Sequence, residues 1–585
     1  GQDGIDGQDG QDAPVFVPDA SIPDYVKRLV DEYSTGTIDP QVQFPLQDTF
    51  TDTIRTIEGV SWNIVVGWLD PLDREGTIFW GSNNDYIAYI GDGFEFGVTD
   101  GPQVAGSSTS GWIWSNFEYI SNSYPAVGAA PSGQNLTLAL WMEQRGELTF
   151  DVTDDAGWDQ AAVDVFVERA REMHGGAWIR VVKDPQSKEW ALDLRADNQR
   201  YDSSSDTQVL ITGIGGYDNR ADITDDAGNA LPNGVVPGIT ADCSGGLSPW
   251  GTIITAEENA QGYYGDLEEG YDSQFLDPNG THNFIAGGNV LLDVTADRSG
   301  RFGRHSDDNI GNTPRDVFGY LVEIDPGVAP SEYYGSVTPG QGHQKLGNMG
   351  RARWENAAFV MDTDFNLIDG EPVVIYGGND RRSGRVYKWV SSQVYMSSMT
   401  KAQVRDLLAD GTNYVAHFAD MDNDSGFTVG GQQPIDQAGR RGTGVWIDLS
   451  VDSTDTPPNF GAPGLVNPNG VTTVGAALQD IEYNQIGGFP TDDDVYRALF
   501  TAANKIGVME TNRPEDIEWN PFDQLVYVAF TNNGDDTTLD DNGVLVQTRG
   551  AAQVATGGRR IAHRGSMITL REGNQASPGS STTFE

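Results

Sequence analysis

The sequence is poor in cysteine, in basic residues and in long apolar runs. One Cys among 585 residues excludes an internal disulfide framework. No stretch approaches 18 consecutive apolar residues, so no transmembrane helix and no membrane insertion are expected. The 36 Lys and Arg face 86 Asp and Glu, which gives a net charge of −50. This charge argues against nucleic acid and anionic membrane surfaces as partners, because both require basic patches.

Several familiar catalytic motifs are also missing. The chain contains no P-loop, and it has no G-x-S-x-G elbow of the kind found in α/β-hydrolases. Its six His show no zinc-ligand spacing. What is abundant is carboxylate oxygen, which makes Ca²⁺ a natural partner. An acidic, Lys-poor surface stays solvated in high salt, so a marine or halophilic source or an exported protein is indicated beside an ordinary soluble acidic protein.

The remaining sequence is dominated by strand and turn signals. Short segments rich in Val, Ile, Tyr and Trp, such as 61–69, 320–326 and 525–533, alternate with turns, and the 72 Gly fit many tight turns. No βαβ rhythm appears, so we expect an all-β fold, either a β-propeller or a large sandwich. No strict repeat is present, so a propeller has to be irregular. A few inserted helices are predicted, at 21–34, 158–173, 400–411 and 492–504.

The first residues form a separate segment. Residues 1–14 carry Gly-x-Asp triplets and are expected to be a flexible tail, with 15–585 forming a single domain. Gly at every third position is the collagen pattern, so self-association through this tail is the alternative interpretation. The opening GQDGIDGQDGQD resembles a mature end after removal of an export signal.

The densest chemical segment is 242–259, DCSGGLSPWGTIITAEEN. It holds Cys243 and the pair Glu257–Glu258. A thiolate with carboxylates suits a transition metal such as iron, with Ca²⁺ held by surrounding oxygens. The alternative for Cys243 is a buried, inert thiol, the commoner fate of a lone Cys. Neighbouring strand residues point to opposite faces, so one glutamate can bind while the other does not.

Other segments offer further candidates. RPEDIEW at 513–519 clusters carboxylates that either hold a cation or form surface salt bridges. In YGGNDRRSGRVYK an Arg pair follows a Gly pair. This pair either contacts phosphate or forms part of a charged turn. SNFEY and GRARWENAAF contribute the rest. The candidates from these segments are Asn116, Glu118, Glu355, Asp380, Arg382, Glu515 and Asp516.

Taken in order along the chain, these segments resemble the PhoX-type alkaline phosphatases. The resemblance rests on NND, SNFEY, HGGAW, DCSGG-x-x-PWGT, T-x-EEN, GYLVEIDP, GRARWENA, GG-x-D-x-R and RPEDIEW with TNN. It spans about residues 60–585. DCSGG…PWGT…EEN and RPEDIEW are its specific elements.

The resemblance implies a secreted phosphomonoesterase built as an irregular six-bladed β-propeller. It implies small phosphate esters as substrates and a buried site of ferric iron, Fe(III), and Ca²⁺. By motif, Arg382 matches a phosphate-contacting Arg and Cys243 an iron ligand. The other metal-ligand positions that it implies or leaves open are Asn116, Glu118, Glu257, Glu258, Glu355, Asp380, Glu515 and Asp516.

The sequence departs from the family pattern in three places. Gly384 stands where the family has a metal-binding Glu, Phe117 replaces a His, and the family sequence continues beyond the SSTTFE end, so C-terminal family sequence is expected to be lacking. The first departure, with the Gly-x-Asp tail, leaves open a catalytically inactive PhoX-like protein with a structural, surface or filament-forming role. A diesterase or lactonase on the same scaffold is a third reading.

Overall fold

The computed structural model covers most of the chain. It describes residues 62–268, 294–381, 384–419, 421–422, 426–429, 442–461, 465–508, 511, 513–530, 538–539, 545–546 and 566–585. The Gly-x-Asp tail, the helix expected at 21–34 and Arg382 lie outside these residues. None of the helices in the described stretches combines the length and apolar character needed to cross a membrane.

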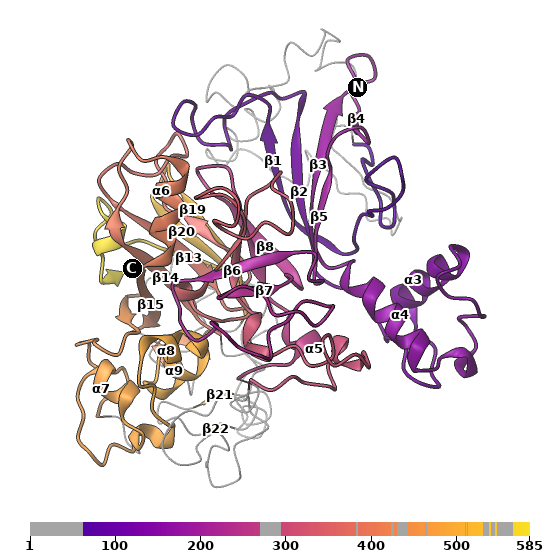
Figure 1. Cartoon of the computed structure of the whole chain (residues 1–585). Helices are drawn as coiled ribbons and strands as arrows, with labels where there is room; N and C mark the ends of the chain where they lie inside the picture. The colour runs from indigo at the N-terminus through magenta and orange to yellow at the C-terminus, as the bar shows by residue number, and fades with distance from the viewer. Residues whose placement is uncertain are drawn as a thin grey trace, which may run out of the picture.

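Two sheets carry the first part of the chain (Figure 1). In the first sheet the order is β1-β2-β3-β4, with β5 also on β3. In the second it is β7-β6-β11-β10-β9-β8, and β6 and β11 are its parallel pair. Their bounds are β1 Asn84–Gly91, β2 Ser110–Phe117, β3 Gly175–Lys183, β4 Trp190–Leu192, β5 Gln199–Tyr201, β6 Gln208–Thr212, β7 Val235–Pro237, β8 Asp242–Leu247, β9 Ile253–Glu257, β10 Leu321–Ile324 and β11 Gln344–Leu346.

Two further sheets and two small hairpins follow. The third sheet has the order β12-β13-β14-β15-β18-β24 and the fourth β19-β20-β23, while β16–β17 and β21–β22 pair on their own. The bounds are β12 Ala358–Phe359, β13 Pro372–Gly378, β14 Val386–Val394, β15 Gly411–Phe418, β16 Met421–Asp422, β17 Gly426–Val429, β18 Gly444–Asp448, β19 Pro514–Asn520, β20 Leu525–Phe530, β21 Thr538–Leu539, β22 Leu545–Val546, β23 Ser566–Leu570 and β24 Thr583–Phe584.

The sheets are arranged like propeller blades. Short, mostly antiparallel strands make up four larger sheets around a shared interior (Figure 1). The expectation of a mostly β, propeller-like chain with few helices is therefore confirmed. One of these expected strands is wrong: residues 62–69 form no strand. Val65 and Val66 pack against buried residues of the first sheet, whereas Trp62 and Ile64 are exposed, so this run covers the sheet without pairing with it.

The helices are insertions between strands. α3 (Gly133–Gln144), which the sequence did not predict, and α4 (Gln160–Arg171) lie together at one side of the molecule (Figure 1). The helix expected at 158–173 is confirmed as α4; it begins after Asp159, whose side chain accepts a hydrogen bond from the Ala162 amide.

The two other expected helices that fall on described residues are present in altered form. α6 (Lys401–Asp406) begins after Thr400 in a capping box with Gln403, and a 3₁₀ turn continues it to Ala409, before Gly411 opens β15. The expected helix 492–504 is two helices, α8 (Asp492–Arg497) and α9 (Leu499–Lys505), because Ala498 leaves the helical conformation at φ −142° and ψ 55°. Unpredicted short helices are α5 (Gln261–Tyr264) and α7 (Val474–Gln479).

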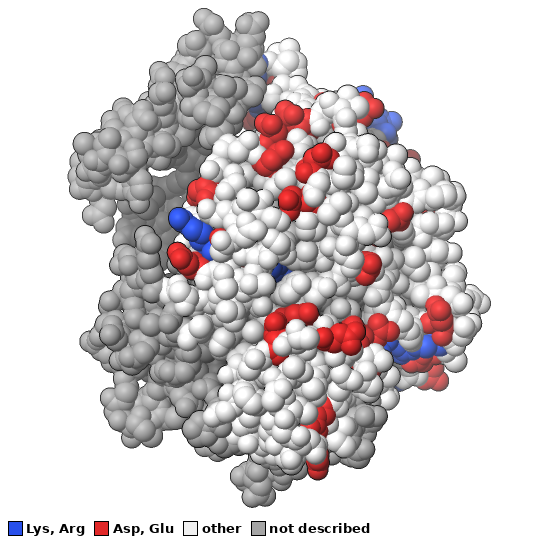
Figure 2. Space-filling view, turned by 90° about the vertical axis from the view of Figure 1, so that its left-hand side faces the viewer, with Lys and Arg blue, Asp and Glu red and all other residues white. Residues whose placement is uncertain are grey.

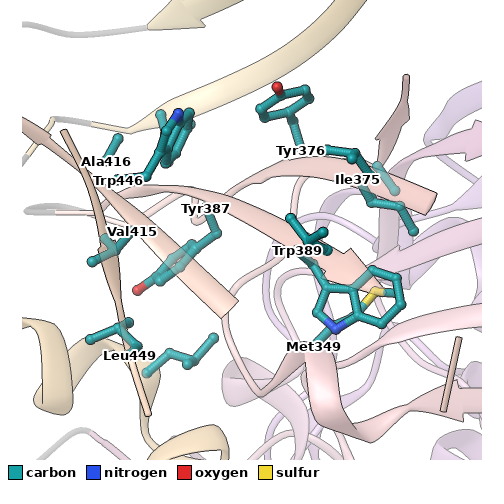
Figure 3. Packing of buried hydrophobic residues seen from close by; sticks show 14 of the residues in the cluster. Met349, Ile375, Tyr376, Tyr387, Trp389, Val415, Ala416, Trp446 and Leu449 are labelled. Atoms are coloured by element: carbon teal, nitrogen blue, oxygen red, sulfur yellow. The ribbon is translucent and has the colours of Figure 1, made fainter. Parts of the chain in front are cut away.

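The largest hydrophobic core lies on the third sheet. Figure 3 shows Trp389 and Met349 on one side of it and Tyr376 and Trp446 on another. Full burial of side chains of this size contributes about 1.5–3 kcal/mol each. The core extends to Ile517 of the fourth sheet, so it holds the third and fourth sheets in fixed positions beneath the loops that carry Glu355 and Asp380.

A buried polar group ties β24 into the third sheet. The Glu572 carboxylate accepts hydrogen bonds from the Tyr376 hydroxyl at 2.5 Å and the Trp446 indole at 3.0 Å. The Lys388 ammonium lies 3.3 Å from the same carboxylate and donates to the Ser581 carbonyl at 2.7 Å. These polar groups are paired inside the fold, so Glu572 fastens the segment that leads to β24 onto the third sheet.

Candidate metal centre

The site is built around the thiol of Cys243. This residue lies on β8 and is 6% exposed. Its Sγ is 3.1 Å from Asp85 Oδ2, at the start of β1, and 3.2 Å from Glu355 Oε1, in the loop before β12. The first, second and third sheets therefore each send one acidic group to the same point.

Around this thiol, ligand atoms converge in three overlapping groups. They are Asp85–Glu118–Cys243, Cys243–Glu258–Glu355 and Glu355–Asp380–Glu515, and within each group the atoms lie within 4.8 Å of one another. We call the seven residues together the Cys243 cluster. Five of the candidates predicted as metal ligands besides Cys243 are thus brought together: Glu118, Glu258, Glu355, Asp380 and Glu515.

Local backbone features aim Cys243 into the cluster. The β8–β9 register shifts between Asp242 and Gly245, and an irregularity of this kind turns side chains away from the regular alternation. Gly246 lets β8 approach the loop that carries Glu355, because a Cβ there would collide with the Ala357 carbonyl. The DCSGG motif therefore supplies both the thiol and the close backbone contact.

Asn116 holds this strand from behind. Its Nδ2 donates to the carbonyls of Cys243 at 2.6 Å and Ser244 at 2.8 Å. Its Oδ1 accepts from the Trp114 indole at 2.6 Å and the Thr255 hydroxyl at 3.0 Å. The amide expected among the metal ligands is thus fully engaged with the protein, and its position fixes the Cys243 backbone.

The glutamate pair separates at the end of β9. Glu257 is fully buried and accepts from the Lys345 ammonium at 2.8 Å and from the backbone amides of Gly319 and Tyr320 at 2.9 and 3.1 Å. Glu258 points the other way, into the Cys243 cluster. The structure therefore places Glu257 outside the cluster, in a buried ion pair.

Burial and like charge raise the pKa values of four of the cluster's groups, Glu118, Cys243, Glu258 and Glu355. Burial, followed by Asp85, raises the pKa of Glu118 to about 7. Burial, followed by Glu515 and Asp380, raises the pKa of Glu355 to about 9. Burial raises the pKa of Glu258 and of the Cys243 thiol, and for both the charge of Glu355 is the next cause. Without a cation, the raised pKa values favour the protonated forms of these four groups; a bound cation would favour their charged forms.

The donor set fits a metal ion. Glu355 is 5% exposed, and its Oε2 has no hydrogen-bond partner, so this buried oxygen is left for another ligand. A thiol beside several carboxylates combines a soft donor for iron with hard donors for Ca²⁺. Cys243 would meet iron, with Glu258 and Glu355 beside it.

The RPEDIEW carboxylates take two different positions. Glu515 belongs to the cluster and also lies 2.8 Å from the Arg513 guanidinium, so the salt-bridge and cation-site interpretations apply to the same residue. Asp516 is exposed, and its Oδ1 accepts from Asn356 Nδ2 at 2.6 Å. Asp516 therefore lies outside the three ligand groups.

Phe117 and Gly384, the described positions at which the sequence is expected to depart from the family pattern, have a clear structural setting. Phe117 packs against Trp80 with ring centroids 4.9 Å apart, and the Arg200 guanidinium lies 4.4 Å above its ring, so Phe117 belongs to the core. A Cβ at Gly384 would collide with the Asn379 carbonyl, and the Gly384 carbonyl accepts from the Thr511 amide at 2.8 Å. This backbone arrangement leaves no room for a glutamate at 384.

Two residues of the site were missing from the predicted set. Asp85 lies in the NND segment directly at the start of β1, and this segment is the signal that could have found it. Asn259, next to the glutamate pair, donates to Glu118 Oε1 at 2.6 Å and also to a Glu258 carboxylate oxygen. Its amide therefore bridges two cluster carboxylates from different strands.

A small cavity of about 20 Å³ adjoins the cluster at Glu258. Arg351, Arg353 and Arg381 line it together with Asp266, which lies 2.7 Å from Arg353 and 3.3 Å from Arg381. The volume suffices for about one water molecule. Guanidinium groups thus stand directly beside the buried carboxylates.

Comparisons with known proteins agree with this geometry. Residues 42–585 match the family described as alkaline phosphatase PhoX. A solved structure, Pseudomonas fluorescens PhoX in complex with vanadate, a transition state analogue, is similar with a TM-score of 0.51 and 20% identity, over 89% of this chain and 71% of that one. A search of curated proteins gave no match. Since the family match covers most of its length, the chain belongs to the PhoX alkaline phosphatase family.

Proposed function

We propose that this chain is a secreted alkaline phosphatase that hydrolyses phosphomonoesters at the Cys243 cluster, using Fe(III) and Ca²⁺. The observation that carries the proposal is the meeting of the Cys243 thiol with Asp85 and Glu355, at 3.1 and 3.2 Å, inside a protein of the PhoX family. Carboxylates beside a thiol oppose its ionisation. A cysteine that only packs in the core gains nothing from such neighbours, so the acidic surroundings of Cys243 indicate a bound cation.

The ligand set follows from the geometry. Cys243, Glu258 and Glu355 form its buried centre, and Asp85 and Glu118 close one side. Bound metal ions supply charge neutralisation for the phosphate group and an activated oxygen nucleophile. Asp380, Glu515 and Asp516 stand at or near the opposite edge, and Arg382 serves as the expected phosphate contact.

The chain's own residues prepare the site for phosphoryl transfer, which needs positioning and charge stabilisation more than covalent chemistry. Asn116 fixes the Cys243 backbone, and Asn259 sets the spacing of Glu118 and Glu258. Glu258 and Glu355 are each 5% exposed, whereas Asp85 is exposed, so solvent and substrate would reach the cluster from the side of Asp85.

The surface charge has to be overcome locally. Figure 2 shows a face on which carboxylates are spread with few basic side chains, and such a surface repels phosphate esters at long range. Cations held at the Cys243 cluster would reverse the field where the substrate binds. The proposed activity therefore depends on metal loading.

The family membership supports further features of the proposal. We expect a six-bladed propeller as a single domain over 15–585, with the hairpins β16–β17 and β21–β22 contributing to the blades beyond the four larger sheets. We also expect secretion.

Hydrolysis of p-nitrophenyl phosphate at alkaline pH tests the function. We expect turnover in protein supplied with iron and Ca²⁺, and little turnover after chelation. Cys243→Ala should lose both activity and bound iron, whereas Met567→Ala, at an exposed site on β23, should keep both. Full activity and full iron content in Cys243→Ala would contradict the thiolate ligand.

The second candidate function is a PhoX-like protein without catalysis. The tight backbone at Gly384 favours it, because no carboxylate can be offered from that position. Absence of turnover in the metal-supplied protein, with filaments or rings in negative-stain microscopy, would support this candidate. Turnover confined to diesters or lactones in a substrate panel would instead point to a related hydrolase.

A further inference from the structure

Arg513 places a positive charge at one side of the Cys243 cluster. Its Nε lies 3.0 Å from Asp380 Oδ1 and its Nη2 lies 2.7 Å from Asp380 Oδ2, a bidentate pair. The same Nη2 lies 2.8 Å from Glu515 Oε1. The planar guanidinium therefore engages two of the three carboxylates in the Glu355–Asp380–Glu515 group.

The backbone holds Arg513 in this position. Its φ is +51°, in the left-handed region, and it precedes Pro514, where extended conformations are strongly preferred. The Arg513 amide donates to the Arg381 carbonyl at 3.2 Å, and β19 begins at the next residue. A disfavoured conformation maintained by its surroundings commonly marks a functional position.

The two sides of the cluster therefore differ. On the Cys243 side, thiol and carboxylates face one another, and Glu355 keeps a buried oxygen without a partner. On the Asp380–Glu515 side, the carboxylates already share a guanidinium. Gly384 adds no carboxylate on this side.

We propose that Arg513 is a built-in cation that takes the place of a metal ion between Asp380 and Glu515. Metal ions then bind only on the Cys243 side, among Cys243, Glu258, Glu355 and the neighbouring Asp85 and Glu118. A glycine at 384 is compatible with this arrangement, because a side that a guanidinium already neutralises needs no further carboxylate. This inference rests on the proposed metal site and specifies which side of the cluster binds metal ions.

Metal stoichiometry tests the inference. The chelated full-length chain is titrated with Ca²⁺ by calorimetry, and bound metal is measured by elemental analysis. Arg513→Gln removes the guanidinium from Asp380 and Glu515, and we expect this variant to bind one more Ca²⁺ per chain than the wild type. Arg513→Lys, which keeps the charge, and Arg180→Gln, which removes a bidentate pair with Asp92 on the first sheet, are expected to match the wild type.

Asp380→Asn provides a second test in a chain that keeps Arg513. If Asp380 holds only the guanidinium, this variant keeps the wild-type Ca²⁺ count; loss of one Ca²⁺ would overturn the inference. An unchanged count in folded Arg513→Gln, or loss of all Ca²⁺ from it, would also overturn it.

The outcome is separable from that of the proposed function. A gain of one Ca²⁺ in Arg513→Gln supports the inference even in a protein without phosphatase activity. Phosphatase activity with equal stoichiometry in the two proteins would leave the proposed function standing and remove the role of Arg513.

Discussion

Glu257 and Glu258 follow one another at the end of β9 and enter opposite surroundings. Glu257 lies against the Lys345 ammonium at 2.8 Å, and both side chains are fully buried. Glu258 is equally deep in the protein, at 5% exposure, yet its neighbours in the cluster are the thiol of Cys243 and the carboxylate of Glu355. Burial raises the pKa of both glutamates, but Lys345 opposes the rise at Glu257, whereas Glu355 adds to it at Glu258.

This comparison separates two uses of a buried acid. A carboxylate paired with a cation of the chain itself is complete, as Glu323 also is with Arg405 at 2.8 Å. A carboxylate surrounded by other acids is incomplete until a proton or a metal ion joins it. The surroundings of each buried acid therefore distinguish the parts of this protein that support the fold from the part that binds.

The largest expected effect follows from breaking the ion pair of Glu257. Glu257→Gln leaves the Lys345 ammonium buried without its carboxylate, and we expect the free energy of unfolding to fall by about 3–5 kcal/mol. Denaturant unfolding of the metal-loaded protein measures this change. Glu257→Gln combined with Lys345→Met should recover part of the loss; no loss in the single variant would show that the ion pair is not the structural partner inferred here.

Substitution of Glu258, the glutamate that faces other acids, should affect the phosphatase activity. Glu258→Gln removes a proposed ligand, and we expect phosphatase activity to fall by about 100-fold or more, which corresponds to about 2.7 kcal/mol. The metal-free variant should be no less stable than the metal-free wild type, because one crowded acid has gone. Activity assays with measured metal content, with the exposed Met567→Ala as control, test this; wild-type activity in Glu258→Gln would contradict the assignment.

The smallest expected effect is the change of the stability of the metal-free protein with pH. In the metal-free protein the raised pKa values mean that the folded state holds protons that the unfolded state releases near pH 4.5. Stability should therefore fall as pH rises from about 4.5 through about 7 for Glu118 and about 9 for Glu355, by at most about 1.4 kcal/mol per pH unit for each such proton.

Thermal unfolding across this pH range, with and without Ca²⁺ and iron, measures the slope. Metal ions should flatten it, because they keep the carboxylates charged in the folded state. A metal-free stability that rises with pH over the same range would contradict the arrangement of unpaired acids.

Most of the fold class was readable from the sequence because short β-branched segments and turns are local signals. The 158–173 periodicity and the Thr400 cap gave two helices directly. The strand predicted at 61–69 is wrong because an apolar pattern does not reveal whether a neighbouring strand is available to pair with it. The number of blades is not a local property, and periodicity gave no measure of it.

The site was predicted less completely, because spacing along a chain does not give orientation. The sequence left Glu257 and Glu258 open, and only Lys345, 88 residues away, distinguishes them. Asp85 was missed although the NND segment contains it, because one acid in a short motif does not indicate that its side chain reaches a metal site. Asn116 lies at the site, but its amide bonds the carbonyls of Cys243 and Ser244. Arg513 was grouped correctly with its carboxylates, but its contact with Asp380 required the structure.

The link between β18 and the segment around Glu572 has a consequence for biosynthesis. The hydrogen bond from Trp446 to Glu572 joins residues 126 positions apart. At a synthesis rate of about 5–20 residues per second, the ribosome needs on the order of ten seconds to supply the second partner after the first. During that time the β18 edge and its aromatic side chains have no partner from β24, so the nascent chain depends on chaperones or on delayed folding at this edge.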